Sequence, residues 1–270
     1  MDRRAPRSCW LDCRASAVAE PTSSAPHVAH ASTLTDVVSW GAQPDALAGN
    51  SQSSGRVLYK GPGGQPETGL WICTPGRWRL AIPRDELCYF VAGRATYVRD
   101  NGERVEIVPH TLVLFPAGWT GECTVHETMR NTYMLTAAAV ADAGSAATAA
   151  TGSATPPAAA WLREPLAQTN LVDWGLIPTM LEGASHTSGK LLYKGPQGRS
   201  ESGIWRCTPG RWACHVTRDE YCHFLSGRST YVHESGEVIE IEPDTLAHFP
   251  QDWRGVCTVH ETVTKVYMIR

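Results

Sequence analysis

An internal duplication constrains the fold of this chain more than any other sequence feature. Residues 36–135 align with residues 170–269 at a constant offset of 134 and without a gap, and about half of the aligned residues are identical. Only two copies exist and each has the length of a domain, so the pattern predicts two tandem domains rather than a solenoid. Eight of the ten tryptophans form matched pairs: Trp40/Trp174, Trp71/Trp205, Trp78/Trp212 and Trp119/Trp253.

The segments outside the two copies have the composition of unpacked chain. Residues 136–169 contain a long stretch of Ala, Thr, Gly and Pro with almost no large apolar residue, which indicates a flexible linker. Residues 1–35 have a similarly unpacked composition and are expected to form a disordered tail. Their arginines are not followed by the apolar region of a secretory signal, and a transit peptide is the weaker alternative, because Asp2 and Asp12 depart from its acid-poor pattern. The expected organisation is therefore a tail, a domain at 36–135, a linker, and a domain at 170–270.

Strand signals are dense within each copy. Short apolar runs are bounded by Gly, Pro and Asn, and the sequence Asp100-Asn101-Gly102 between Thr96–Val98 and Val105–Ile107 is a hairpin signal. About eight short strands in each copy predict an all-β fold of two closed or sandwiched antiparallel barrels.

Composition excludes several classes of protein. The chain is 42% hydrophobic and 19% charged with a net charge of −3, and it has neither the basic patch of a nucleic-acid binder nor an apolar run of membrane-spanning length. We therefore expect no nucleic-acid partner and no membrane partner. Its nine cysteines include no C-x-x-C pair. Six of them match across the copies and are expected to be small buried thiols, which favours the reducing cytoplasm: Cys73/Cys207, Cys88/Cys222 and Cys123/Cys257.

Two motifs in each copy resemble those of cupins. The first is a glutamate followed seven residues later by a glycine, at Glu86–Gly93 and at Glu220–Gly227. The second is a proline turn after an apolar strand, LVLFPAGW at 112–119 and, less closely, LAHFPQDW at 246–253. The surrounding sequence resembles the cupin subfamily named for (S)-ureidoglycine aminohydrolase. The resemblance implies a bicupin of two tandem jelly-roll (double-stranded β-helix) barrels that pair within the chain, and it implies further association as a homodimer.

The metal site of many cupins consists of His-x-His, the glutamate of the first motif and a histidine of the second motif. In the first copy the matching positions are Arg79, Ala81 and Gly121, so that only Glu86 remains. A metal is not expected there. Glu86 is expected instead to pair with Arg77 or Arg79 if either points inward, as a structural ion pair or as part of a polar-ligand pocket.

The second copy retains more of the metal ligands. Ala213 and Gly255 replace two of them, but His215 and Glu220 remain and His248 is added. The resemblance implies one divalent metal, Mn, Fe, Ni or Zn, bound by His215, Glu220 and His248. Strand alternation from Glu220 places Cys222 inward and His223 outward. The residues expected to line substrate pockets are Glu86, Arg77, Arg79, Arg211 and Cys257.

Two functions stay open at this stage. One is an enzyme, hydrolase-like or oxygenase-like, that acts on a small polar or nitrogen-containing metabolite in the second barrel, with His215 and Glu220 binding metal or performing acid–base catalysis. The alternative is a metal-free bicupin that binds a small-molecule ligand or has a structural role, which the loss of most imidazoles favours. The ureidoglycine aminohydrolase reaction is not implied, since Ala213 and Gly255 replace ligands of that family.

Overall fold

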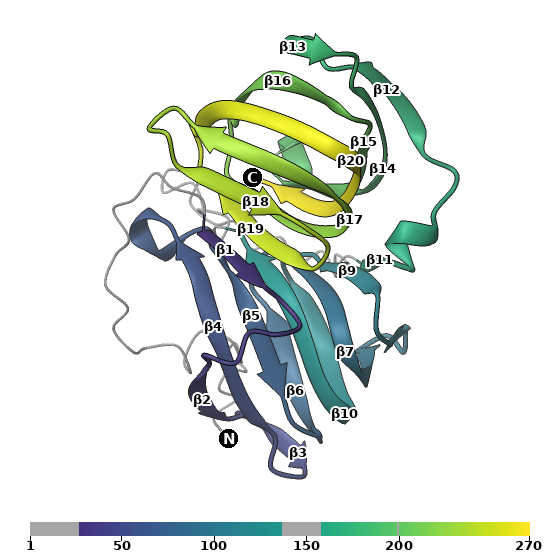
Figure 1. Cartoon of the computed structure of the whole chain (residues 1–270). Helices are drawn as coiled ribbons and strands as arrows, with labels where there is room; N and C mark the ends of the chain where they lie inside the picture. Colours follow the sequence, from purple (N-terminus) through teal and green to yellow (C-terminus); the bar gives the residue numbers. More distant parts are fainter. Residues whose placement is uncertain (1–26, 137–157, 199) are drawn as a thin grey trace, which may run out of the picture.

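A computed structural model describes residues 27–136, 158–198 and 200–270. The chain forms two antiparallel barrels, which confirms the all-β expectation (Figure 1). The first barrel contains β2 (Val38–Ala42), β3 (Ala46–Ala48), β4 (Gln52–Lys60), β5 (Glu67–Cys73), β6 (Gly76–Ile82), β7 (Glu86–Arg99), β8 (Arg104–Ile107), β9 (Thr111–Phe115) and β10 (Trp119–Leu135). The second contains β12 (Val172–Leu176), β13 (Met180–Gly183), β14 (His186–Lys194), β15 (Glu201–Cys207), β16 (Gly210–His215), β17 (Glu220–His233), β18 (Val238–Ile241), β19 (Thr245–Phe249) and β20 (Arg254–Ile269).

The duplication in sequence is a duplication in topology. Two further strands, β1 (His27–His30) and β11 (Ala160–Arg163), extend the sheets. The main path of one sheet is β11-β9-β7-β10-β5-β4-β2, and that of the other is β1-β19-β17-β20-β15-β14-β12. The expected hairpin is confirmed, since β7 pairs with β8 across the turn that contains Gly102 at a φ of 91°. Three short 3-10 helices complete the described chain: η1 (Pro62–Gly64), η2 (Pro165–Ala167) and η3 (Pro196–Gly198).

The glycine of the first motif is required by the backbone. Gly93 lies in β7 with a φ of 86°, where the register between β7 and β10 shifts, and a Cβ there would collide with the carbonyl oxygen of Thr128. Gly227 meets the same constraint in the second barrel, with a φ of 81° and Thr262 as the neighbour. Only glycine combines this φ with so close an approach of two strands.

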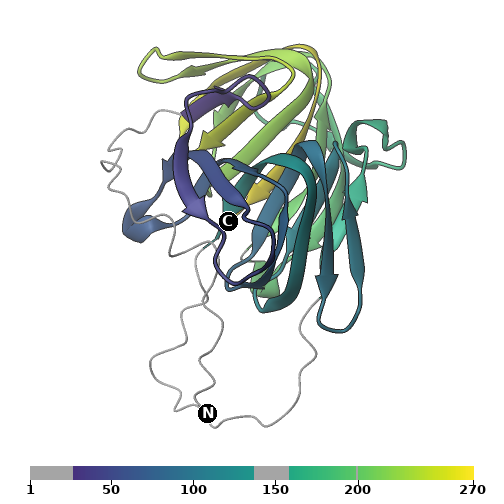
Figure 2. The same ribbon diagram turned by 90° about the horizontal axis from the view of Figure 1, so that it is seen from below.

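The two barrels exchange their leading strands. β1 (His27–His30) pairs with β19 of the second barrel, and β11 (Ala160–Arg163) pairs with β9 of the first. Figures 1 and 2 show β1, in purple, lying beside strands of the second barrel. The expected tail and linker therefore include ordered, hydrogen-bonded strands. Residues 1–26 and 137–157 of those two segments lie outside the described residues.

The barrels pack against each other through their outer faces, as the resemblance implied. One apolar cluster contains residues of both barrels, and we call it the inter-barrel core. Its buried members include Leu87, Leu114 and Met134 from the first barrel, and Tyr221, Leu246 and Met268 from the second. Separate clusters fill the inside of each barrel. No helix within the described part of the chain is long and apolar enough to cross a membrane.

Candidate functional site

Three neighbouring strands of the second barrel carry the polar groups of its interior. The cross-strand register aligns Glu201 of β15 and Glu220 of β17 with Ile269 of β20. The same register aligns Trp205 and Phe224 with Lys265, four residues before Ile269. Because side chains alternate along a strand, residues of the two rows share one face. That face is the interior, since these side chains line a cavity or belong to the second-barrel core.

Lys265 is the cation of this interior. Its ammonium Nζ donates to Oε1 of Glu220 at 2.7 Å and to Sγ of Cys222 at 3.1 Å, and it lies 4.9 Å from the ring centroid of Trp205. Burial alone would lower the pKa of Lys265, but its neighbours Cys222 and Glu220 outweigh burial and raise this pKa. The ammonium is therefore a permanent hydrogen-bond donor, and contact with the ring adds a cation–π attraction.

The cavity beside Lys265 has a volume of about 250 Å³ and walls made mostly of aromatic and aliphatic side chains. Its second carboxylate, Glu201, accepts a hydrogen bond from the Tyr267 hydroxyl at 3.1 Å. Polar groups fixed on rigid strands against aromatic walls are the features of a small-molecule site. The aromatic and apolar lining consists of Trp174, Ile177, Trp205, Trp212, Val216, Tyr231, Phe249, Tyr267 and Ile269, together with Cys214.

The first barrel repeats most of this arrangement but lacks the cation. Glu67, Glu86, Cys88 and Tyr133 occupy the aligned positions of Glu201, Glu220, Cys222 and Tyr267, and the Tyr133 hydroxyl donates to Glu67 at 2.9 Å. Asn131 stands where the second barrel has Lys265. The exchange of this single side chain gives the second barrel an internal cation.

The structure does not place His215 inside the barrel. Its side chain is 37% exposed and Nε2 lies 3.3 Å from Oδ1 of Asp252, on the outer surface. The inward residues of β16 are Trp212 and Cys214, which pack with the second-barrel core. A shift of one residue along a strand moves every side chain to the opposite face of the sheet. The two positions aligned with His-x-His, 213 and 215, are therefore both on the outside.

His248 is buried but faces the other barrel. Its ring stacks on Tyr59 of the first barrel, with centroids 3.9 Å apart, and Nε2 lies 3.6 Å from Oδ1 of Asp219. Its neighbours in β19, Ala247 and Phe249, are the residues that face the second-barrel interior. The structure thus separates Glu220, His215 and His248, which were expected to share one metal.

The arginines expected to line pockets are also on the outer surface. Arg77 donates to Glu122 at 2.6 Å, Arg79 donates to Asp100 at 2.9 Å, and Arg211 donates to Glu182 at 2.9 Å. Glu86 does lie inside the first barrel, where Cys88 donates to it at 3.4 Å. Cys257 is in the second-barrel core, and burial raises the pKa of its thiol.

The interior of the second barrel does not fit the metal of the family. The Lys265 ammonium already neutralises Glu220, the one family ligand that faces the cavity. At the position of the last histidine, Gly255, an added Cβ would lie 2.6 Å from Cη2 of Trp253, so the indole fills the space of a side chain. Among the described residues no three His, Cys, Asp or Glu side chains are grouped so that they could hold a metal ion.

Two features of the site were missed by reasoning from the sequence. Lys265 is not among the expected site residues, although the difference between Asn131 and Lys265, each two residues before a tyrosine present in both copies, is a signal in the sequence. Trp174 is not among the expected pocket residues, but it lines the cavity. The facing of His223, predicted outward, is confirmed by its contact with Thr132 of the first barrel.

Comparison with known proteins agrees with this fold. Among solved structures, the chain is similar to a Pseudomonas syringae protein of unknown function, with a TM-score of 0.63 and 14% identity over 80% of this chain and 86% of that one. It is also similar to Ylba from E. coli, with a TM-score of 0.56 and 11% identity over 90% of each chain. A third similar structure is a cupin 2 conserved barrel domain protein from Leptotrichia buccalis, with a TM-score of 0.55 and 9% identity over 80% of this chain and 88% of that one. At these identities the similarity shows the fold alone.

The sequence comparisons identify the domains. No curated protein matches the chain. The EutQ-like cupin domain matches residues 60–133 and again residues 194–267, which together make up more than half of the sequence. Each match begins in the strand before the first inward glutamate and ends at the inward tyrosine of the last strand. The chain therefore belongs to the cupin superfamily, as a bicupin with two EutQ-like cupin domains in tandem.

Proposed function

We propose that the second barrel binds a small polar, nitrogen-containing molecule beside Lys265 and does so without a metal ion. The observation that carries the proposal is the contact of Lys265 with Glu220 inside an aromatic cavity. Lys265 has three protons, of which Glu220 and Cys222 engage two. Glu220 has a second carboxylate oxygen, Oε2, and each carboxylate oxygen can accept more than one hydrogen bond.

These two groups form a donor and an acceptor side by side. A carboxamide matches them, since its carbonyl oxygen accepts from Lys265 and its N–H donates to Glu220. The aromatic walls suit a flat or apolar remainder of the ligand. The resemblance to (S)-ureidoglycine aminohydrolase-type cupins also supports a nitrogen-containing ligand, although it does not carry over that reaction.

The geometry favours binding over the catalytic alternative. His215, the expected acid–base partner of Glu220, is outside the barrel. The raised pKa of Lys265 keeps it an ammonium, so it is a poor nucleophile for a carbonyl. Each group of the cavity is thus arranged to hold a ligand in place.

Isothermal titration calorimetry of the full chain with benzamide tests this proposal. Benzamide is expected to bind, and Lys265→Asn, which installs the residue of the first barrel, is expected to weaken binding at least about tenfold, as the loss of a hydrogen bond to a charged group predicts. Lys60→Met is the control, because Lys60 is an exposed lysine of the first barrel that does not line the cavity. Absence of benzamide binding, or equal binding by Lys265→Asn, would overturn the proposal.

A further inference from the structure

A second cavity, of about 350 Å³, lies between the two barrels. It shares no lining residue with the cavity inside the second barrel. Its walls come from β7, β17, the turns before β9 and β19, and the segments after β1 and β11. The lining residues are Ser32, Tyr89, Val91, His110, Glu164, Pro165, Leu166, His223, Phe224, Leu225, Pro243 and Asp244. Junctions between domains are frequent positions for ligand sites.

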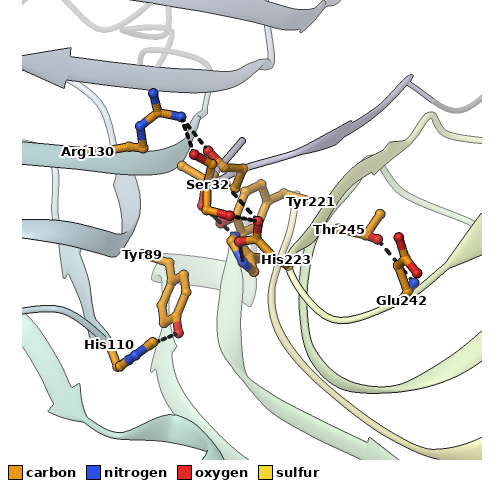
Figure 3. Close-up of polar contacts among 11 residues, drawn as sticks. Ser32, Tyr89, His110, Arg130, Tyr221, His223, Glu242 and Thr245 are labelled. Carbon is orange, nitrogen blue, oxygen red and sulfur yellow. Dashed lines mark hydrogen bonds and ion pairs between the residues drawn. The ribbon is translucent and has the colours of Figure 1, made fainter. Parts of the chain in front are cut away.

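Aligned positions of the two copies meet in the wall of this cavity, where the ring centroids of Tyr89 and His223 are 4.6 Å apart, and the residue types at these polar positions differ between the copies. Tyr89 aligns with His223, and His110 aligns with Asp244. Each copy nevertheless keeps a contact between its strand residue and its turn residue: Tyr89 Oη lies 2.8 Å from His110 Nδ1, and His223 Nε2 lies 3.4 Å from Asp244 Oδ1 (Figure 3). The turn residues also share a left-handed backbone, with φ of 64° and 73°. The architecture is shared, but of the two aligned turn residues only Asp244 is a carboxylate.

The carboxylate of Asp244 is held firmly. Its Oδ2 accepts from the backbone N–H of Ser32 at 2.7 Å and from the Ser32 hydroxyl at 2.6 Å. Arg130 in turn donates to the carbonyl oxygens of Ala31 and Ser32, which fixes this segment (Figure 3). Burial alone would raise the pKa of Asp244, but hydrogen bonds from His223 and Ser32 outweigh it and lower this pKa, so the group is ionised at neutral pH.

His223 does not offset this negative charge. Nδ1 lies 3.0 Å from the Thr132 hydroxyl, which is itself 2.6 Å from the Tyr221 hydroxyl. Burial lowers the pKa of His223, which favours the neutral ring. A neutral ring also fits the contacts, because Nε2–H can donate to Asp244 while Nδ1 accepts from the Thr132 hydroxyl.

The cavity is therefore acidic and partly apolar. Glu164, the second carboxylate, is exposed at its rim and is bonded to the first barrel through its backbone N–H, which donates to the carbonyl oxygen of His110 at 2.9 Å. Neither a lysine nor an arginine is among the described residues that line the cavity. Val91, Leu166 and Leu225 supply apolar walls. The carboxylates attract a cation, and the apolar walls stabilise a bound apolar group by removing its surface from water.

We propose that the inter-barrel cavity binds a small organic cation, with an ammonium group between Asp244 and Glu164 and an apolar body against Leu225 and Val91. The site is independent of the ligand proposed for the second barrel. Because both barrels line it, its occupant contacts both domains.

Calorimetry of the full chain at neutral pH with benzylamine, which is then an ammonium, provides the test. Benzyl alcohol and benzoate are the neutral and anionic controls of the same shape. We expect benzylamine to bind at least about fivefold more tightly than benzyl alcohol, since one close charge pair is worth that much near a surface. Benzoate is expected not to bind.

Variants assign the binding to this cavity. Glu164→Gln, a change at an exposed side chain, is expected to weaken benzylamine binding about fivefold. Glu242→Gln, which alters an exposed carboxylate near His30 outside the cavity, is expected to have no effect. Binding of benzyl alcohol as tight as that of benzylamine overturns the proposal. So does a loss of benzylamine binding in Glu220→Gln but not in Glu164→Gln, because that result assigns the amine to the second barrel.

Discussion

Nζ of Lys265 lies 2.7 Å from Oε1 of Glu220 inside the second barrel, whereas the residue aligned with Lys265 in the first barrel is Asn131. The glutamate is common to both copies and the cation belongs to one. A lysine ammonium thus supplies the positive charge that a divalent metal supplies in many cupins. It also provides hydrogen-bond donors at a fixed point of an aromatic cavity.

The ion pair makes a stability prediction. Lys265→Met is expected to lower the free energy of unfolding by about 2–3 kcal/mol, because it leaves Glu220 poorly solvated and without its partner. Replacing both residues, as Lys265→Met with Glu220→Leu, is expected to recover most of this loss, since no unpaired charge remains. Urea unfolding of the two variants measures the difference. Equal destabilisation of the single and double variants would show that Glu220 does not depend on Lys265.

Buried histidines predict a loss of stability in mild acid. Burial lowers the pKa of His248 and of His223 below the ordinary 6.5, although Asp219 and Asp244 respectively oppose the shift. Unfolding restores the ordinary pKa, so the unfolded chain binds more protons as the pH falls below about 6.5, and the free energy of unfolding decreases. The decrease continues until the pH passes the lowered pKa of the folded state.

Replacing His248 with the residue that the first copy has at the aligned position tests this pH dependence. His248→Leu, which copies Leu114, is expected to flatten the pH dependence of urea unfolding between about pH 7.5 and pH 5. His186→Leu, at an exposed histidine beside Asp173, is the control and is expected to leave that slope unchanged. A slope that is the same in the wild type and in His248→Leu would rule out a contribution from this buried ring.

The contact between Gly255 and Trp253 makes a third prediction. Gly255→Ala is expected to destabilise the protein by about 2 kcal/mol, because the added Cβ overlaps the carbonyl oxygen of Val232 and the indole ring. Combining it with Trp253→Leu is expected to cost less than the sum of the two changes, which thermal unfolding measures. Additive losses would mean that the ring does not occupy the space above Gly255.

The exchanged strands make a fourth prediction. Ser32→Ala removes the hydroxyl that donates to Asp244 and is expected to cost about 1 kcal/mol. The amide of Ala31, which donates to the carbonyl oxygen of Asp244 at 3.0 Å, is expected to exchange with solvent faster. Ser39→Ala alters an exposed serine away from this junction and serves as the control. Unchanged exchange at Ala31 would show that the side chain does not anchor β1.

The sequence was sufficient to predict the barrels because period-two patterning and glycine placement are local. The turn at Gly102 and the crowding at Gly93 are consequences of backbone sterics that residue identity reveals. The face of β16 was not predictable in this way. Trp212 and His215 are both reasonable inward residues, and only the packed structure shows that the indole takes the interior. The exchange of β1 and β11 depends on pairings between strands far apart in the chain, which local patterns do not encode: β11 pairs with β9, and Ser32, which follows β1, binds Asp244 at a separation of 212 residues.

The metal content of the purified full chain tests the central claim most directly. We expect less than about a tenth of an equivalent of Mn, Fe, Ni or Zn after dialysis against buffer, unchanged by Glu220→Ala, because an ammonium already neutralises that carboxylate. Glu86→Ala provides the matched change in the first barrel. About one equivalent of a single metal, lost in Glu220→Ala and retained in Glu86→Ala, would contradict the account and restore a metal centre to the second barrel.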